Sequence, residues 1–205
     1  MSTGRLEAFS DAVIAVAATL LVLNLVVPPP GSEHSLAHDL GHQWPAYGAY
    51  AISFITIGII WINHHVMIGR LREPDHSILI LNLVLLMTIG LLPFVTNLLS
   101  TYLTQSHGQQ LAAAVYAGAF LLMAVAFATL NWHILMHRSG LLRMELPKEE
   151  RRRILVASVS GLGPYVIATG LAFISSYATL AICGALALFY ALPVASGLGR
   201  GAPAG

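Results

Sequence analysis

The sequence predicts an all-α integral membrane protein with six transmembrane helices. Of its 205 residues, 57% are hydrophobic and only 9% are charged, whereas a soluble domain carries roughly a quarter charged residues. Apolar runs long enough to cross the hydrocarbon core, which takes about 20 residues, recur along nearly the whole chain. The basic residues fall only in alternate loops. We therefore expect one membrane-embedded domain over 1–205 and no separate soluble domain.

Six apolar runs qualify as spans: 6–28, 44–66, 76–99, 109–136, 152–174 and 177–196. The first is expected to stay in the protein, because its flank is both acidic and basic and more spans follow it, unlike a cleavable signal peptide. We expect the fourth span to extend beyond the bilayer. Proline removes a backbone donor, so kinks are expected at Pro93 in the third span and at Pro164 in the fifth, where Gly161 and Gly163 precede it.

The distribution of basic residues predicts the orientation in the membrane. All ten precede the first span, follow the sixth, or lie between spans two and three or between four and five; they are Arg5, Arg70, Arg72, Arg138, Arg143, Lys148, Arg151, Arg152, Arg153 and Arg200. The other three loops have none. By the positive-inside rule both termini are expected in the cytoplasm, which requires an even number of spans.

Several classes of function are disfavoured by what the spans and loops contain. The single cysteine, Cys183, excludes an intrachain disulfide and a cysteine-based metal site. Neighbouring His64 and His65 point about 100° apart on a helix, with no third ligand spaced to converge, so no metal site is expected there. No cofactor and no nucleic-acid partner are expected. The basic cluster 148–153 is a topology signal and a candidate contact for anionic membrane lipids.

The first apolar run begins with residues that hydrocarbon tolerates poorly: Glu7, Ser10 and Asp11. A helix capped at residue 11 and ending near 27 would be only about 25 Å long, too short for the bilayer core. The helix is therefore expected to begin near Thr3, which places Ser10 and Asp11 inside it, close to the cytoplasmic surface. An ionised carboxylate at that depth needs a partner, and a cation is expected.

The second span returns to the same membrane level and ends with the stretch "WINHHVMIGRL". We therefore expect a polar cluster at the cytoplasmic end, with these candidate members: Arg5, Ser10, Asp11, Asn63, His64 and His65. In the alternative interpretation, Ser10 and Asp11 are a solvated helix start and the histidines form an interfacial belt. A pH-sensing role for the histidine pair is open, because histidine titrates near neutrality.

At 3.6 residues per turn the rest of the first span divides into two stripes. One stripe consists of small residues beneath the carboxylate, suited to close helix contact: Asp11, Ala15, Ala18 and Val22. The other consists of Phe9, Ala12, Val16, Thr19 and Leu23. Thr19 is the only polar member of this second stripe. From the residues alone, the second stripe is ordinary lipid-facing or packing surface.

The opening motif resembles that of a known family. Arg5, three further residues, Phe9-Ser10-Asp11 and then "AVIAVAATLLVL" resemble the first-helix signature of the transmembrane protein 175 family, the endosomal and lysosomal potassium channels and their prokaryotic relatives. The stretches "WINHH" and "NLVLLMTIGLLPFVT", residues 82–96, add to the resemblance. It implies a passive, potassium-permeable cation channel of a prokaryotic plasma (inner) membrane, assembled as a homotetramer whose four first helices line a central pore.

The resemblance also implies residue roles. Val16, five residues after the motif aspartate, would form a hydrophobic constriction together with Leu23, and Thr19 would form a selectivity layer that transiently binds potassium. A ring of hydroxyls implies weak selectivity for potassium and caesium over sodium. The residues implied to anchor the pore helix are Arg5, Phe9, Ser10, Asp11, Asn63, His64 and His65.

Two other functions are weighed against a channel. A secondary or proton-coupled ion transporter would require acidic or basic residues at mid-membrane, and the middle of every expected span is free of charge. An intramembrane enzyme would need convergent catalytic groups, and the region of Asp11, His64 and His65 offers no complete catalytic set. The transporter is the stronger of these alternatives.

Overall fold

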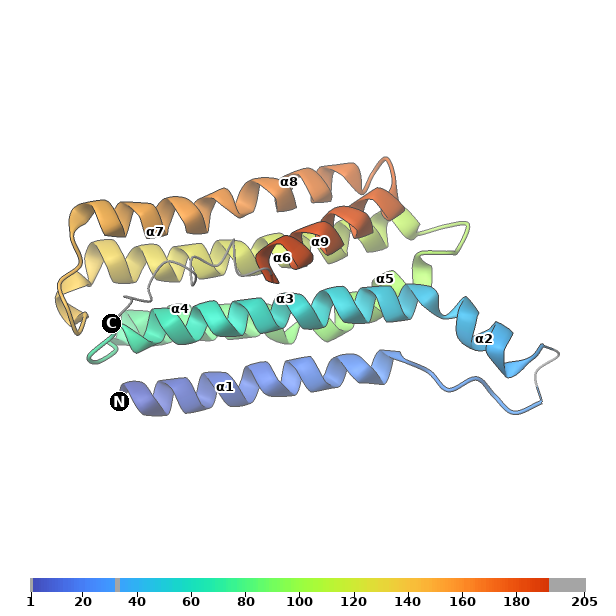
Figure 1. Ribbon diagram of the computed structural model, residues 1–205, viewed down its shortest axis with the longest axis horizontal. Coiled ribbons are helices and arrows are strands. Elements are labelled where there is room, and N and C mark those ends of the chain that lie inside the picture. The colour runs from blue at the N-terminus through green and yellow to red at the C-terminus, as the bar shows by residue number, and fades with distance from the viewer. Residues whose placement is uncertain (1, 32–33, 192–205) are drawn as a thin grey trace, which may run out of the picture.

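The structure is a computed structural model that describes residues 2–31 and 34–191, and over these ranges it is helical without a β-strand. This confirms the predicted all-α class. Figure 1 shows the elements lying along one common direction. In chain order they are α1 (Thr3–Leu20), the 3₁₀ turn η1 (Leu21–Asn24), α2 (Leu36–His42), α3 (Trp44–Gly69), α4 (His76–Gly90), α5 (Leu92–Tyr102), α6 (Gln109–Trp132), the π-helical turn η2 (His133–His137), the 3₁₀ turn η3 (Ser139–Leu141), α7 (Lys148–Ser160), α8 (Leu162–Leu171) and α9 (Ser176–Ala191).

Five helical segments are long and apolar enough to cross a membrane: Thr3–Asn24, Trp44–Gly69, His76–Tyr102, Gln109–His137 and Lys148–Leu171. A sixth apolar helix, Ser176–Ala191, is shorter. The chain is therefore a multi-pass membrane protein. The expected end of the sixth span at residue 196 and Arg200 both lie outside the described residues.

Two spans are broken where the sequence predicts bends. In the third span, α4 ends at Gly90 and α5 starts at Leu92, with Pro93 in the first turn of α5. In the fifth span, α7 ends at Ser160 and α8 starts at Leu162, with Pro164 in its first turn. Proline lacks a backbone N–H and clashes with the preceding turn, so a helix ends or bends just before it.

The helix α6 forms the centre of the bundle and packs against α4, α5, α7, α8 and α9. Its Tyr116 and Phe120 are fully buried, and alanines such as Ala113 and Ala117 let neighbouring helices approach closely. The helix α1 has a different position. It packs against α3 and α4 and lies along one edge of the bundle (Figure 1).

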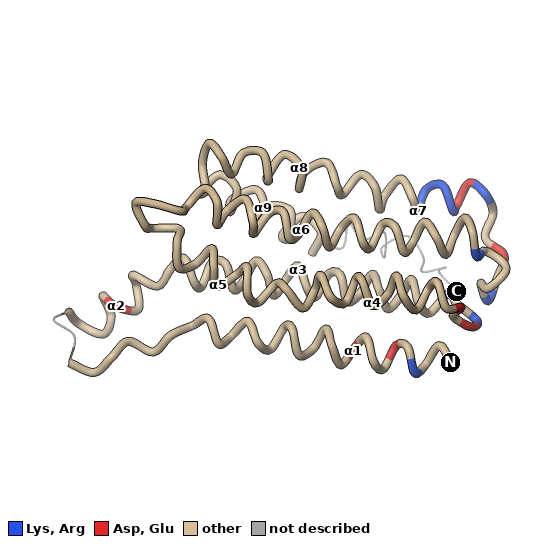
Figure 2. Tube along the Cα trace, turned by 180° about the vertical axis from the view of Figure 1, so that it is seen from behind, with Lys and Arg blue, Asp and Glu red and all other residues tan. Residues whose placement is uncertain are grey.

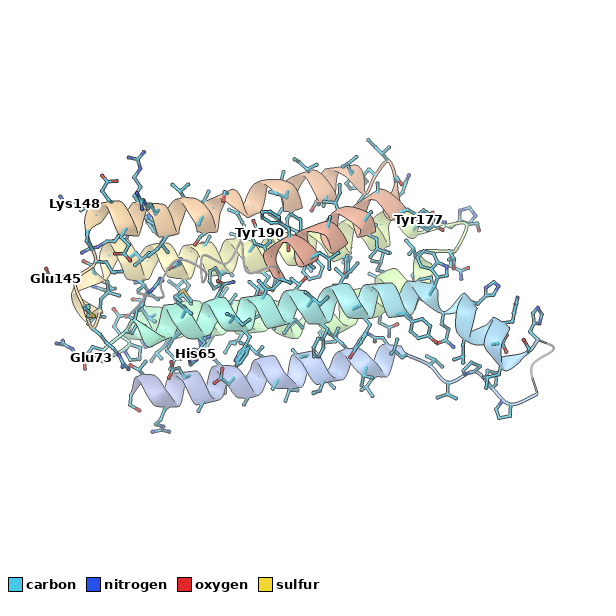
Figure 3. All side chains as sticks on the ribbon, in the orientation of Figure 1. His65, Glu73, Glu145, Lys148, Tyr177 and Tyr190 are labelled. Atoms are coloured by element: carbon cyan, nitrogen blue, oxygen red, sulfur yellow. The ribbon has the colours of Figure 1, made fainter. Side chains whose placement is uncertain are left out.

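The charged residues are concentrated at one end of the bundle. Every described Lys and Arg lies at the end that carries the N-terminus (Figure 2), which we call the basic end. Glu73, Glu145 and Lys148 lie at this end, while Tyr177 lies at the opposite end (Figure 3). An ion pair of 2.5 Å between Arg138 and Asp75 connects two of the segments that meet there. The short helix α2 lies beyond the opposite end (Figure 1).

Candidate functional site

The helix α1 has one face packed and one face without a partner in the chain. Its packed face is Thr3, Leu6, Ser10, Ile14 and Ala17, continued by Leu21, all buried at the three- and four-residue spacing of a helix. The opposite stripe is exposed along its whole length: Phe9, Ala12, Val16, Thr19 and Leu23. Val16 is 56% exposed and Leu23 is 72% exposed. A single chain therefore leaves a continuous apolar stripe, with one hydroxyl in it, uncovered.

The helix α1 uses only part of the close-packing stripe expected from the sequence. Ala15 and Val22 of the small-residue stripe are exposed, and Asp11 and Ala18 are only half-buried. Larger side chains, such as Leu6 and Ile14, make the contact with the bundle instead. Within one chain the prediction holds for Asp11 and Ala18 but not for Ala15 and Val22, because small side chains permit close packing but do not determine which face of the helix is bound.

The hydroxyl of Thr19 is held by its own helix. Its Oγ1 donates to the carbonyl oxygen of Val16 at 2.9 Å. A hydroxyl has one proton and two lone pairs, so this bond directs the proton towards the backbone and leaves the oxygen lone pairs for another group. Leu23 follows in the 3₁₀ turn η1, one turn beyond Thr19.

A buried polar network centred on Asn82 connects three helices. Asn82 of α4 donates through Nδ2 to Ser10 Oγ at 3.0 Å. Its Oδ1 lies 2.7 Å from Nε2 of His64 on α3, and an amide oxygen can only accept, so His64 is the donor. All three side chains are buried. Buried polar groups that satisfy one another restrict their helices to one arrangement.

Asp11 has a different partner from the expected cation. Its Oδ1 accepts a hydrogen bond of 2.9 Å from the indole Nε1 of Trp61 on α3. Two turns earlier, Thr3 donates through Oγ1 to the carbonyl oxygen of Arg72 at 3.0 Å. Side chains at three positions therefore attach α1 at the basic end of the bundle.

The other predicted anchoring residues lie near this network without joining it. Arg5 and His65 are exposed, and within the described ranges their side chains form no hydrogen bond or ion pair. Asn63 donates to the carbonyl oxygen of Ile59 in its own helix. Phe9 is 48% exposed and belongs to the uncovered stripe. Of the expected cluster, the structure brings Ser10 and His64 together.

Sequence reasoning missed the network roles of Asn82, Trp61 and Thr3. Asn82 had a signal that could have revealed it, because a lone amide inside the apolar run "ILILNLVLLM" is costly unless it is hydrogen-bonded. Trp61 and Thr3 gave no such signal. At the opposite end, Asn24 donates to the carbonyl oxygen of Pro93 at 3.3 Å, so α1 is attached there too.

Comparisons with known proteins agree on one family. The family described as the endosomal/lysosomal potassium channel TMEM175 matches residues 5–93. A potassium channel of Streptomyces collinus is 43% identical over 191 residues, which cover 92% of this chain and 91% of that protein. The endosomal/lysosomal proton channel TMEM175 of Mus musculus is 32% identical over 152 residues, 70% of this chain and 30% of that protein.

A solved structure has the same fold. The crystal structure of a lysosomal potassium-selective channel TMEM175 homolog from Chamaesiphon minutus superposes with a TM-score of 0.83 at 37% sequence identity. The match covers 92% of this chain and 96% of that one. The motif that begins at Arg5, the helical fold and the near full-length relatives thus lead to the same conclusion: the chain belongs to the TMEM175 family.

Proposed function

We propose that this protein is a potassium-permeable cation channel that conducts passively through a pore lined by α1. The observation that carries the proposal is the uncovered stripe of Val16 and Thr19 on α1 and Leu23 in the adjoining turn η1. An exposed apolar stripe on a membrane helix can face lipid, another subunit or a pore. Membership of a family whose near full-length relatives are named potassium channels favours the pore.

The stripe has the chemistry of a hydrophobic constriction with one layer of oxygen. Rings of Val16 and Leu23 side chains would hold back water and ions when close together and pass them when apart. Between these rings, Thr19 presents lone pairs, because its proton is directed to Val16. A single hydroxyl layer replaces only part of an ion's hydration shell. We therefore propose weak selectivity for potassium and caesium over sodium.

The polar contacts of α1 at the basic end determine which face turns towards the pore. Ser10 and Asp11 are neighbours in sequence, yet they bind different helices through Asn82 and Trp61. A rotation of α1 would break both bonds. We propose that Ser10, Asp11 and His64 hold the pore helix, while Arg5, Phe9, Asn63 and His65 surround the same end and complete the anchor in the assembly.

One chain supplies one stripe, so a closed pore requires several copies around an axis. We propose a homotetramer in which each chain forms a single domain of six helices surrounded by membrane lipid. Because the basic residues lie at one end, we place that end and both termini on the cytoplasmic side of a prokaryotic plasma membrane. Potassium is the permeant ion in this proposal, and no resident cofactor is included.

The test is potassium flux into liposomes that contain the purified protein. Val16→Asn replaces the apolar side chain of the proposed constriction with a polar one, so flux should rise because water and ions cross the constriction more easily. Val22→Asn is the matched control. Val22 is 49% exposed and lies in the turn η1 that continues α1 but outside the stripe, so flux should be unchanged. Absence of potassium flux in every variant, or equal effects of the two substitutions, would contradict the proposal.

The relative in mouse, named a proton channel, supports a second candidate, in which protons move through this protein. A pH-sensitive dye inside the same liposomes separates the possibilities. Proton entry without potassium movement would indicate proton conduction through the pore. Potassium movement that requires an opposing proton gradient would indicate a proton-coupled transporter instead.

A further inference from the structure

A histidine cluster lies at the end of the bundle opposite the basic residues. The segment "HSLAHDLGH", residues 34–42, contains a histidine at every fourth position: His34, His38 and His42. Residues four apart share one face of a helix. The helix α2 begins at Leu36, and its cap Ser35 accepts a hydrogen bond from the backbone N–H of His38 at 3.3 Å. The local fold therefore aligns the three imidazoles.

The side chains of this segment converge. The ring centroids of His34 and His38 are 4.4 Å apart, and those of His38 and His42 are 4.5 Å apart. Nδ1 of His38 lies 3.6 Å from Oδ1 of Asp39. One potential ligand atom each from His34, His38 and Asp39 lies within 4.8 Å of the others. Two imidazoles and a carboxylate thus lie close together.

We infer that His34, His38 and Asp39 bind one divalent transition-metal ion of the zinc class. Imidazole nitrogen with a carboxylate oxygen is a ligand set that suits Zn²⁺, whereas Mg²⁺ and Ca²⁺ prefer oxygen alone. Ligands of a tetrahedral zinc ion lie about 3.3 Å apart, from metal–ligand distances of about 2.0 Å. The three atoms already lie within 4.8 Å of one another, so a modest side-chain adjustment on metal binding would reach that separation, and water would take the fourth position.

The charge distribution favours a cation at this place. Among the described residues every Lys and Arg lies at the other end of the bundle, so none opposes a bound metal here (Figure 2). His42 packs against the ring of His38 and limits the positions of that imidazole. The site is distant from the network of Ser10 and Asn82. It uses no residue of the proposed pore, so it stands independently of the channel function.

Calorimetric titration of the full-length protein in detergent, after removal of any purification tag, tests this site. With ZnCl₂ we expect one ion per chain, and with MgCl₂ no binding. His38→Ala should weaken zinc binding by about tenfold or more, since even second-shell changes cost about 10- to 100-fold. Unchanged elution volume and melting temperature would show that the variant, altered at an exposed position, is folded.

His137→Ala is the matched control. His133 and His137 also lie four residues apart, with ring centroids separated by 5.6 Å, but next to Arg138 of the basic end. The control should bind zinc as the unmodified protein does. A His38→Ala isotherm identical to that of the unmodified protein, or loss of binding in the control, would overturn the inference. Zinc binding is measured without ion flux, so a failure of the channel proposal would not affect the result.

Discussion

Asn82 connects three helices through one side-chain amide. It donates to Ser10 of α1 and accepts from His64 of α3, and all three side chains are buried. In an apolar interior each of these groups would be costly without the others. The position of α1 against the bundle therefore depends strongly on a residue that belongs to neither the helix nor the opening motif.

Asn82→Ala should lower the free energy of unfolding by about 1–3 kcal/mol, because Ser10 Oγ and His64 Nε2 lose their partner while remaining buried. Denaturation of the protein in detergent measures the change. Asn97→Ala is the control: Asn97 is exposed and its side chain bonds only to Thr101 of its own helix, so a change within about 0.5 kcal/mol is expected. Equal losses in the two variants would contradict this role of Asn82.

Thr19 tests the contribution of a single hydroxyl to ion selectivity. Thr19→Ser retains the hydroxyl and should keep the preference for potassium over sodium. Thr19→Val retains the shape without the oxygen and should bring the permeability ratio towards one. Reversal potentials under opposed potassium and sodium gradients measure the ratio. An unchanged preference in Thr19→Val would remove this residue from the selectivity layer.

At the residue scale the sequence predicted which side chains lie near one another better than it predicted which of them form hydrogen bonds. The depth of Ser10 and the return of the second span placed it near His64, and both are in the buried network. The partner of Asp11 was expected to be a cation but is the indole N–H of Trp61. Periodicity gives the level and face of a side chain, whereas its partner depends on the rotation of two helices, which periodicity leaves undetermined.

The helix α1 is attached at its two ends and has an apolar middle. At the basic end Thr3, Ser10 and Asp11 make the contacts, and beyond the helix Asn24 bonds to Pro93. Between these ends, Ile14 and Ala17 supply apolar packing. An element attached in this way can turn only if polar bonds at its ends break.

Trp61→Phe should loosen α1 while leaving the rest of the bundle intact, because phenylalanine keeps an aromatic ring but lacks the N–H that binds Asp11. Hydrogen–deuterium exchange should accelerate in the first turns of α1 and stay unchanged in α6. Trp132→Phe provides the control, since Trp132 is a similarly exposed tryptophan at the end of α6, and exchange in α1 should then be unchanged. Faster exchange throughout the protein, or unchanged exchange in α1, would contradict the conclusion that Trp61 anchors α1 locally.

Among the elements, the breaks were predictable and the short helices were not. Proline chemistry correctly placed the interruptions near Pro93 and Pro164. The helix α2 (Leu36–His42) lies between the first two predicted spans, where the sequence predicts no helix, because so short a helix has little periodicity to detect. Of the zinc-class ligands proposed above, His38 and Asp39 are in this helix and His34 precedes it, although the sequence predicts no metal site.

At the scale of the whole molecule the bundle is asymmetric. The central helix α6 is surrounded by its own chain, whereas α1 lies at the edge with Phe9, Val16 and Leu23 uncovered. The all-α class and the multi-pass character could be predicted from composition and run length. The number of subunits could not be predicted. A stripe on one helix indicates that a face is uncovered, but it does not indicate how many subunits meet there. The homotetramer thus stays a prediction.

The central claim is that the Val16 stripe of α1 lines the path of potassium. The most direct test is potassium current in planar bilayers from a Val16→Cys protein, in a Cys183→Ala background that removes the native, buried thiol. A water-soluble cationic thiol reagent should block this current, because its charge would then lie within the constriction. Val22→Cys should stay conducting. If mass spectrometry verifies that the reagent has labelled Val16→Cys and the potassium current is still undiminished, the Val16 stripe does not line the path of potassium.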